Sequence, residues 1–498
     1  MSVARVSSRA QIGLTAPRVE VEVHLGGGLP TFTIVGMSPG AAKESKERVR
    51  AALASCNFEH PAGRITVSLS PADLPKDGGR YDLPIALGIL LASGQGGLSE
   101  KKLGDTEFYG ELGLTGEIKP VRGMLLAAAH AAREGRPILV PEANVREARL
   151  AAPARVYGAT NLLHVCDGGI DTVEVAAPVA ALPSTAPDLA DVRGQAVAKR
   201  ALIVAAAGGH SLLMVGPPGT GKSMLAQRLP GLLPPLDGAE ALDVAAIASV
   251  SSRGFEPREY GQRPFRAPHH TASAGAIIGG GPHARPGEVS LAHRGVLFLD
   301  ELPEFNRSVL ESLREPLESG VVAISRAAMR IQYPARFQLV AAMNPCPCGY
   351  LGDSSGRCRC APPVVSRYRA RISGPLLDRI DLRVTVAALL NEDLLGEAET
   401  LAPQTPAAAQ RVREARARQM ARAGKLNADL TGAETQEHCK PDRVGRRLIA
   451  QARAKITLSA RGVHRVMRMA RTIADLEGSE TITTAHLAEA LQLRRALE

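Results

Sequence analysis

The sequence predicts an α/β protein in which a parallel-sheet domain is preceded by an α+β domain and followed by a helical one. Three observations support this prediction. A glycine-rich turn separates an apolar run from a helical segment over residues 211–229. Short alternating runs mix with helical segments before it, and long Ala/Arg/Leu-rich segments fill the end of the chain. The length of 498 residues suits about three domains.

We expect the first domain to span residues 1–172. Val19, Val21 and Val23 alternate with Glu20 and Glu22, which is typical of a half-buried strand. Helical patterns follow over 39–54 and 82–93, so strands and helices are mixed along this part of the chain. Residues 173–190 are rich in Ala, Pro and Val, and this composition predicts a linker.

The middle domain, expected over 191–392, contains a phosphate-binding pattern. An apolar strand precedes the loop and a helix follows it, which is the context that the pattern requires. Backbone N–H groups of such a loop bind phosphate oxygens, and the helix N-terminus adds the positive end of its dipole. Lys222 would contact the terminal phosphates and Ser223 would bind Mg²⁺. The loop consists of Gly216, Pro217, Pro218, Gly219, Thr220, Gly221, Lys222 and Ser223.

Two further apolar runs end in polar side chains. The run 295–299 is followed by Asp300 and Glu301, as expected for a buried parallel strand that presents carboxylates at its C-terminal end. Asp300 would belong to the Mg²⁺ shell, and Glu301 would be the general base that polarises the attacking water. The run 339–343 ends at Asn344, which can orient that water or contact the γ-phosphate. A turn that begins at Asn-Pro is the alternative for Asn344.

Arg379 lies in a fourth segment, 373–381. An arginine at this place would be supplied to the nucleotide of a neighbouring subunit, where it would neutralise transition-state charge. An ion pair with Asp378 or Asp381 is the alternative.

In this order, the four segments resemble the AAA+ ATPases. The stretches 264–270, 287–295 and 334–337 extend the resemblance to the magnesium-chelatase-like ATPases of the YifB/ComM type, over essentially the whole chain. The resemblance implies ATP hydrolysis with Mg²⁺ in a ring of identical subunits, expected to be a hexamer. It also implies a helical C-terminal domain, here 407–498, that supplies an arginine to the nucleotide. Arg461 matches best, Arg465 is the alternative, and a plain basic helix face is the competing interpretation.

The first domain resembles the proteolytic domain of Lon and the ribosomal S5-like fold at 75–78 and 120–123. Arg80 and Leu125 occupy the positions at which Lon has its nucleophilic serine and its lysine. Without a nucleophile and an activating amine we expect no peptidase activity.

The resemblance also places two segments at the pore of the ring, an insert at roughly 255–285 and a hairpin over 321–333. Arg326 and Arg330 lie in the hairpin and could contact DNA phosphates. A solvated hairpin tip is an equally good interpretation.

Four of the seven cysteines, Cys346, Cys348, Cys358 and Cys360, lie within fifteen residues. Four thiols on a glycine-bearing loop suit a structural, tetrahedral Zn²⁺. The C-x-C spacing is tighter than the usual C-x₂-C, and redox-active thiols are the alternative. Cys56, Cys166 and Cys439 are expected to be packed thiols.

The net charge of +10 suits a nucleic-acid partner, and aromatic residues make up only 3% of the chain. DNA would therefore be held through its phosphates rather than by base stacking. The resemblance implies a DNA motor, since ComM-type proteins are associated with branch migration during natural transformation. The ATPase subunit of a metal chelatase is the alternative, which the Lon-like domain disfavours. No apolar run could span a membrane and no signal peptide is evident, so we expect a cytoplasmic protein.

Overall fold

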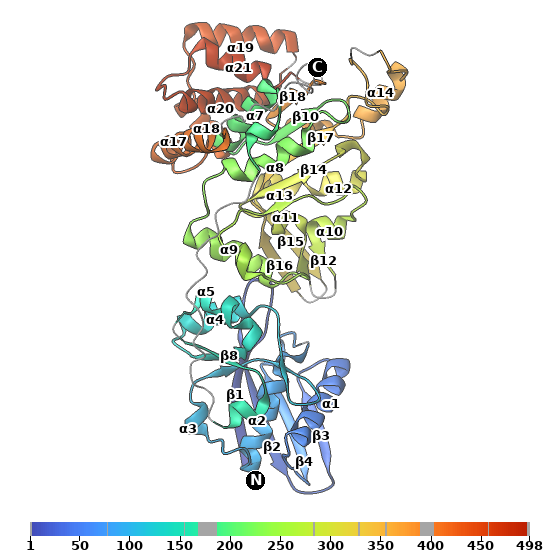
Figure 1. Ribbon diagram of the computed structural model, residues 1–498, viewed down its shortest axis with the longest axis vertical. Coiled ribbons are helices and arrows are strands. Elements are labelled where there is room, and N and C mark those ends of the chain that lie inside the picture. The colour runs from blue at the N-terminus through green and yellow to red at the C-terminus, as the bar shows by residue number, and fades with distance from the viewer. Residues whose placement is uncertain are drawn as a thin grey trace. The chain divides into compact units, whose positions relative to one another are not determined.

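The computed structural model describes residues 2–76, 78–153, 155–167, 187–281, 284–326, 329–353, 356–388, 403–456 and 458–495 (Figure 1). The chain forms two compact units. Unit 1 comprises Met1–Leu182 and Gly238–Gly261, and unit 2 comprises Pro183–Asp237 and Gln262–Glu498.

Unit 1 is built on a seven-stranded mixed sheet with the order β3-β4-β2-β1-β5-β8-β9. Strands β1/β2 and β2/β4 are antiparallel, and the other pairs are parallel. Val19, Val21 and Val23 are fully buried, as their alternation predicted. The strands are β1 (Ser2–Arg9), β2 (Arg18–Gly26), β3 (Thr31–Val35), β4 (Arg64–Ser70), β5 (Glu107–Phe108), β8 (Ile138–Pro141) and β9 (Val156–Ala159).

The helices of unit 1 lie close to the predicted ranges. Helix α1 (Pro39–Ser55) begins with proline at its first position, where a missing N–H costs nothing. Helix α2 (Asp82–Ser93) ends at Gly94, which has a left-handed backbone. The shorter elements are α3 (Glu100–Leu103), β6 (Glu111–Leu112), β7 (Ile118–Lys119), α4 (Met124–Arg133), α5 (Val145–Ala151) and α6 (Leu162–Cys166).

One helix of unit 1 comes from a distant part of the sequence. Helix α9 (Gly238–Ser249) follows the phosphate-loop helix α8 (Lys222–Leu232) in the chain, yet it packs against α4. The hydroxyl of Ser249 donates a hydrogen bond to the buried Glu147 carboxylate. The Leu125 backbone N–H donates to the same oxygen at 3.2 Å. Burial raises the pKa of Glu147, against the hydrogen bonds from Ser249 and Leu125.

Unit 2 contains a five-stranded parallel sheet with the order β11-β14-β17-β10-β18. The three central strands are buried along their whole length, which explains their unbroken apolar sequence. Because all five strands run in one direction, the loops that follow them meet at one edge of the sheet. The strands are β10 (Leu212–Val215), β11 (Phe265–Arg266), β14 (Val296–Leu299), β17 (Gln338–Met343) and β18 (Leu382–Thr385).

Helices and one hairpin surround this sheet. Strands β15 (Val321–Arg326) and β16 (Met329–Pro334) form the antiparallel hairpin that the family resemblance implied over 321–333. The other elements are α7 (Ala196–Gly208), α10 (Ala274–Ile278), β12 (Gly279–Gly280), β13 (Arg285–Pro286), α11 (Glu288–Leu291), α12 (Arg307–Ser312), α13 (Arg314–Ser319), α14 (Pro362–Arg369) and α15 (Gly374–Asp378).

The C-terminal part is helical, as predicted, and packs on α7 beside the parallel sheet (Figure 1). Residues of the sheet and of these helices share one apolar core. Among the described residues no helix is both long and apolar enough to cross a membrane. The helices are α17 (Thr405–Ala423), α18 (Gly432–His438), α19 (Arg443–Ile456), α20 (Ala460–Leu476) and α21 (Thr484–Gln492).

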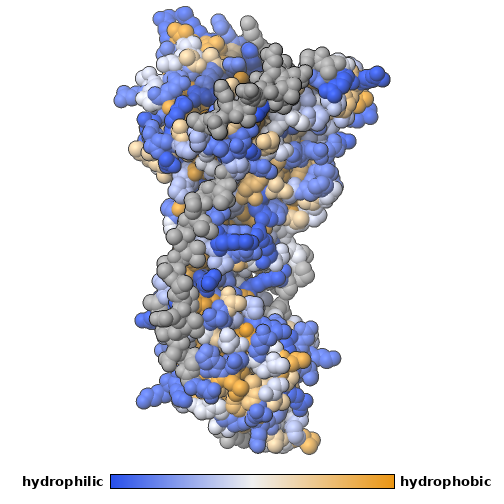
Figure 2. All heavy atoms as spheres, in the orientation of Figure 1, coloured by the Kyte–Doolittle hydropathy of each residue, from blue (hydrophilic) through white to orange (hydrophobic). Residues whose placement is uncertain are grey.

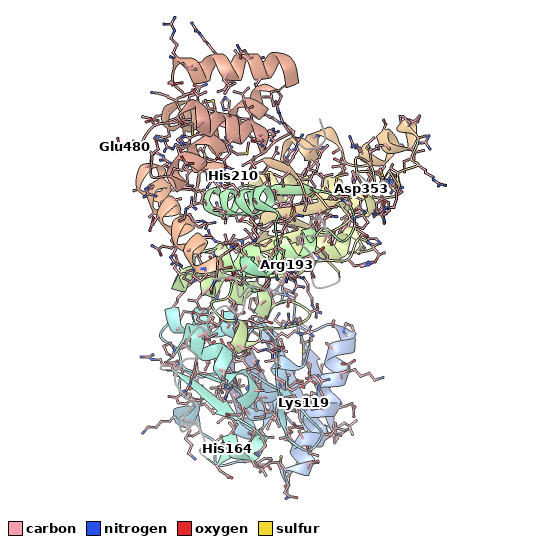
Figure 3. All side chains as sticks on the ribbon, turned by 45° about the horizontal axis from the view of Figure 1, so that its top comes forward. Lys119, His164, Arg193, His210, Asp353 and Glu480 are labelled. Atoms are coloured by element: carbon pink, nitrogen blue, oxygen red, sulfur yellow. The ribbon has the colours of Figure 1, made fainter. Side chains whose placement is uncertain are left out.

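A buried polar cluster around Asp381 joins the sheet to α20. The Asp381 carboxylate lies 3.3 Å from Nδ1 of His210, whose Nε2 lies 2.8 Å from the Thr472 hydroxyl; Figure 3 labels His210. Arg465 of α20 completes the cluster with an ion pair to Asp381. Burial alone raises the pKa of Asp381, but His210 and Arg465 together hold it far below its usual range. Removal of a buried carboxylate that is paired in this way strongly destabilises the folded protein.

Candidate nucleotide-binding site

The phosphate-binding pattern lies where the sequence placed it, between β10 and α8. Gly219 and Gly221 have φ angles of 80° and 85°, in the left-handed region that favours glycine. A Cβ at Gly216 would lie 2.2 Å from the carbonyl oxygen of Val386, so no larger residue fits there. The loop therefore needs glycine for its path as well as for close approach of a phosphate.

Lys222 points back into this loop. Its Nζ donates to the carbonyl oxygens of Gly216 at 2.8 Å and Pro217 at 2.7 Å, and it lies 3.3 Å from Oδ1 of Asn344. Burial lowers the pKa of Lys222, and the carboxylates of Asp300 and Glu301 oppose that change. The ammonium group thus lies at the edge of the sheet where the terminal phosphates of a nucleotide would be bound.

Ser223 and Asp300 meet at the same edge. The Ser223 hydroxyl donates to Oδ2 of Asp300 at 2.6 Å, and Oδ1 of Asp300 accepts the Glu301 backbone N–H at 2.9 Å. A hydroxyl and a carboxylate are the oxygen ligands that Mg²⁺ prefers, so these two residues fit the ion. The structure therefore brings together residues that are 77 positions apart in the sequence.

Glu301 contacts a residue that the sequence analysis did not assign to the site. Nδ1 of His270 lies 3.2 Å from Oε2 of Glu301, and the His269 and His270 rings have centroids 4.1 Å apart. Glu301 has a left-handed backbone, with φ 52°, and a side chain that is 53% exposed. The sequence signal that could have identified His270 was the histidine pair shortly after β11. Strand β11 pairs with β14, and Glu301 follows β14.

The two arginines expected to contact nucleotide line a separate cavity of about 410 Å³. Arg379 is ion-paired with Glu318 rather than with either aspartate considered from the sequence. Arg461 is exposed, whereas Arg465 is committed to Asp381. No phosphate-loop residue lines this cavity. Its lining consists of Glu318, Asp378, Arg379, Gly432, Ala460, Arg461, His464, Arg465 and Arg468.

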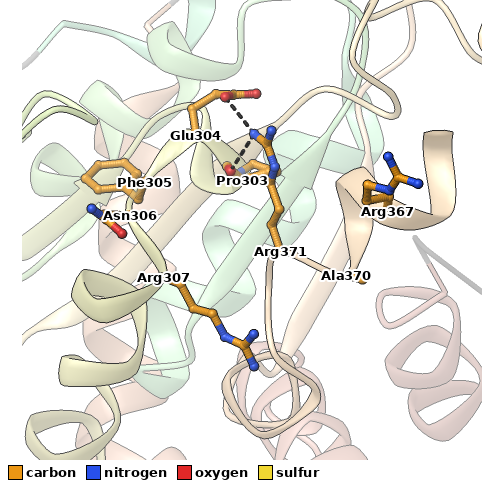
Figure 4. Close-up of a pocket in the computed structure, with 8 residues that line it drawn as sticks. All are labelled: Pro303, Glu304, Phe305, Asn306, Arg307, Arg367, Ala370 and Arg371. Atoms are coloured by element: carbon orange, nitrogen blue, oxygen red, sulfur yellow. Dashed lines mark hydrogen bonds and ion pairs between the residues drawn. The ribbon is translucent and has the colours of Figure 1, made fainter.

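Another cavity, of about 460 Å³, lies after β14 (Figure 4). Arg371 donates to Glu304 at 2.8 Å and, at 3.3 Å, to the carbonyl of Pro303. The lining is rich in arginine and comprises Pro303, Glu304, Phe305, Asn306, Arg307, Arg367, Ala370 and Arg371.

The hairpin and the cysteine cluster are the remaining candidate sites. Arg330 is exposed on β16, while the side chain of Arg326 lies outside the described residues. The thiols of Cys346, Cys348, Cys358 and Cys360 gather so that their Sγ atoms all lie within 4.8 Å of one another.

Comparison with known proteins agrees with this geometry. Residues 188–394 match the family model described as magnesium chelatase, subunit ChlI. Residues 21–144 match subunit ChlI of Mg-chelatase, and 403–494 match the ChlI C-terminal model. Competence protein ComM of Haemophilus influenzae is 47% identical over 99% of this chain and 98% of its own length. This chain belongs to the magnesium-chelatase-like ATPase family. YifB of Escherichia coli is 46% identical over 99% of the chain and 97% of its own length.

Membership of the magnesium-chelatase-like family implies an AAA+ ATPase that uses ATP and Mg²⁺. The Mg²⁺ ion would neutralise charge that develops on the transferring phosphoryl group. We expect Lys222 to bind the terminal phosphates, Asp300 and Ser223 to hold the ion, and Glu301 to accept a proton from the attacking water. The amide of Asn344, beside Lys222, would orient that water or the γ-phosphate.

Lys222→Ala and Glu301→Gln should separate ATP binding from hydrolysis. Loss of the Lys222 charge should weaken ATP binding about 10- to 100-fold, since a charged hydrogen-bond donor is removed. Glu301→Gln keeps the shape but removes the base, so ATP should still bind while turnover falls about 100- to 10,000-fold. Titration with a fluorescent ATP analogue and phosphate release measure the two effects. The control is Glu304→Gln, which should turn over normally. Equal loss of binding in both site variants would contradict these roles.

His270→Ala should raise ATP turnover in the absence of any partner. We expect the 3.2 Å contact with His270 to hold the Glu301 carboxylate back from the attacking water. A contact between side chains this exposed contributes at most about 1 kcal/mol, so the expected increase is about two- to fivefold. In a Glu301→Gln background the same substitution should have no further effect. A slower His270→Ala enzyme would show that the contact instead aligns the base.

Proposed function

We propose that the chain is an ATP-driven ring motor that acts on DNA, with branch migration or helicase activity in recombination or natural transformation. The observation that carries this proposal is the extent of similarity. Competence protein ComM matches over 99% of this chain. The 67 kDa magnesium-chelatase subunit of Heliobacterium mobile is 30% identical but covers only 42% of it.

The charge distribution supports a polyanionic partner. The net charge is +10, and Trp is absent. Arg330 is exposed on the β15–β16 hairpin, and a second group of arginines surrounds the cavity drawn in Figure 4. On the face seen in Figure 2, the surface of unit 2 is predominantly hydrophilic, with scattered apolar side chains. Contact with phosphates rather than with bases is the binding mode that such a surface favours.

We also propose that unit 1 shares the Lon-like, S5-like fold and serves as a scaffold. Arg80 is 9% exposed, and its guanidinium donates to the carbonyl of Arg9 at 3.3 Å. It also donates to the carbonyl of Arg122. The apolar side chain of Leu125 is buried. Neither position offers a nucleophile or an amine for hydrolysis.

Ring assembly would bring Arg379 to the nucleotide of a neighbouring subunit, and the C-terminal domain would supply Arg461 to the nucleotide. Both line one cavity that contains no phosphate-loop residue. Head-to-tail contacts close identical subunits into a ring, and we propose that this cavity lies at such a contact. The ion pair with Glu318 would then be exchanged for phosphate oxygens.

The alternative function is a chelatase-like ATPase subunit that remodels a partner protein. The family models carry the chelatase name, and the nucleotide machinery suits both functions equally. Response to DNA separates the two.

The DNA motor predicts ATP turnover that is stimulated by DNA and affinity that falls steeply with salt. Arg330→Ala should weaken binding to all sequences alike and flatten the salt slope by about one unit, because one phosphate contact is lost. Single-stranded, duplex, forked and four-way DNA should each be titrated by fluorescence anisotropy at several salt concentrations. Arg133→Ala, an exposed arginine of unit 1, is the matched control and should leave the slope unchanged. No stimulation by any of these DNAs would favour the chelatase-like alternative.

Mixed rings test whether Arg379 acts on a neighbouring subunit. Arg379→Ala and Lys222→Ala proteins should each be inactive alone. When the two proteins are mixed randomly in equal amounts, about a quarter of the interfaces would pair an intact loop with an intact arginine. Activity should therefore return towards a quarter of the wild-type value. Mass photometry verifies that subunits exchange. No recovery in rings shown to mix would contradict a role in trans.

A further inference from the structure

The cysteine cluster has the dimensions of a mononuclear metal site. Sγ of Cys346 lies 3.3 Å from that of Cys348 and 3.7 Å from that of Cys358, and Cys348 and Cys358 are 3.6 Å apart. A tetrahedral Zn²⁺ with bonds of about 2.3 Å places its sulfur ligands about 3.8 Å apart. All four cysteines are free thiols, and their Sγ atoms lie within 4.8 Å of one another.

The described residues of the loop between the cysteines make local contacts, among them an ion pair of Arg357 with Asp353 at 3.3 Å and the Arg357 guanidinium 4.1 Å from the Tyr350 ring centroid. Cys346 is buried, but Cys348 is exposed and Cys358 and Cys360 are half-buried. Several of the described residues between them are exposed, and Gly349, Gly352 and Gly356 all have positive φ angles. A glycine-rich surface loop loses much conformational entropy on ordering, and a metal ion that binds four side chains at once compensates for that loss.

This loop contacts the nucleotide site directly. A Cβ at Gly349 would lie 2.7 Å from Cδ of Pro218 in the phosphate loop and 3.8 Å from Cγ of Asn344. Asn344, which lies 3.3 Å from Nζ of Lys222, precedes Cys346 by two residues. Cys346 thus lies shortly after the end of the strand that presents Asn344. Gly349, directly after Cys348, packs against Pro218 of the phosphate loop.

The helix that follows the cysteine loop returns to the same strand end in its last turn. Helix α14 begins directly after Cys360. Nε of Arg369 donates to the carbonyl of Pro345 at 3.4 Å, and a hydrogen bond joins Tyr368 to the backbone of Asn344. The cysteine loop therefore starts just after Asn344 and Pro345, and the helix that follows it contacts these two residues again.

We propose that Cys346, Cys348, Cys358 and Cys360 bind one structural Zn²⁺ ion, which braces Asn344 and Pro218 in the geometry needed to bind ATP. Four thiolates complete the tetrahedral shell and leave no open position for chemistry. Soft thiolate ligands also select zinc over Mg²⁺, so the two ions of the enzyme do not compete. Removal of the zinc frees the loop, and the phosphate loop and Asn344 then lose their lateral support. The expected loss of ATP affinity depends on the nucleotide site described above being correct. Zinc binding by the four cysteines does not depend on it.

Metal content and ATP affinity test the proposal without any DNA. Protein purified without chelator should contain about one Zn²⁺ per chain by elemental analysis. Cys348→Ser/Cys358→Ser should lose the zinc and bind a fluorescent ATP analogue about tenfold more weakly. Cys56→Ala, which removes a buried thiol of unit 1, is the control and should keep both the zinc and the ATP affinity.

Two further measurements guard against a variant that simply fails to fold. Wild-type protein stripped of zinc by a thiol-specific mercurial should lose ATP affinity and regain it on addition of thiol and Zn²⁺. Gly349→Val should weaken ATP binding while it retains zinc, because its side chain would collide with Pro218. Metal-free wild-type protein, or iron in place of zinc, would overturn the metal assignment. Zinc-free protein with unchanged ATP affinity would overturn the brace.

Discussion

The site depends on one geometric constraint, the parallel alignment of β10, β14 and β17. Val215 pairs with Met343 and Leu299 pairs with Ala341, so the three strands end nearly level. Residues that are far apart in the sequence therefore emerge side by side at one edge. Residues that follow these strands form two hydrogen-bonded pairs there, Lys222 with Asn344 and Ser223 with Asp300. The cysteine loop follows β17 at that same edge.

Much of this edge was predictable, because apolar strands and the polar residues after them are local signals. The contact between Ser223 and Asp300 followed from two such strands in a single sheet. His270 was missed because its contact with Glu301 depends on where the loop after β11 turns, which no periodicity encodes. The Glu318 partner of Arg379 was missed for the same reason, since it lies 61 residues away. The placement of α9 in unit 1 likewise has no local signature.

The net charge indicates binding to a polyanion less well than the position of each cationic side chain does. Arg465 contributes to the value of +10, yet it is committed to Asp381 inside unit 2. Arg422 is similarly paired with the buried Asp475 at 2.7 Å. Such residues hold α17 and α20 in place and do not add to a surface that attracts phosphates. Exposed arginines such as Arg330 are the ones whose counterions would be released on binding a polyanion.

The position of α9 affects how the protein can be divided. The chain passes between the two units three times, after Leu182, Asp237 and Gly261. Cleavage within 173–190 would therefore not yield an intact ATPase fragment. A fragment starting at residue 187 would keep α9, in which Ala241, Ala245 and Ile247 are buried in the full chain, but would lose the helix α4 that packs against it. Expressed alone, such a fragment would be prone to aggregate through this uncovered helix. Gene fusion or domain exchange in this family should treat unit 1 and its inserted helix as one piece.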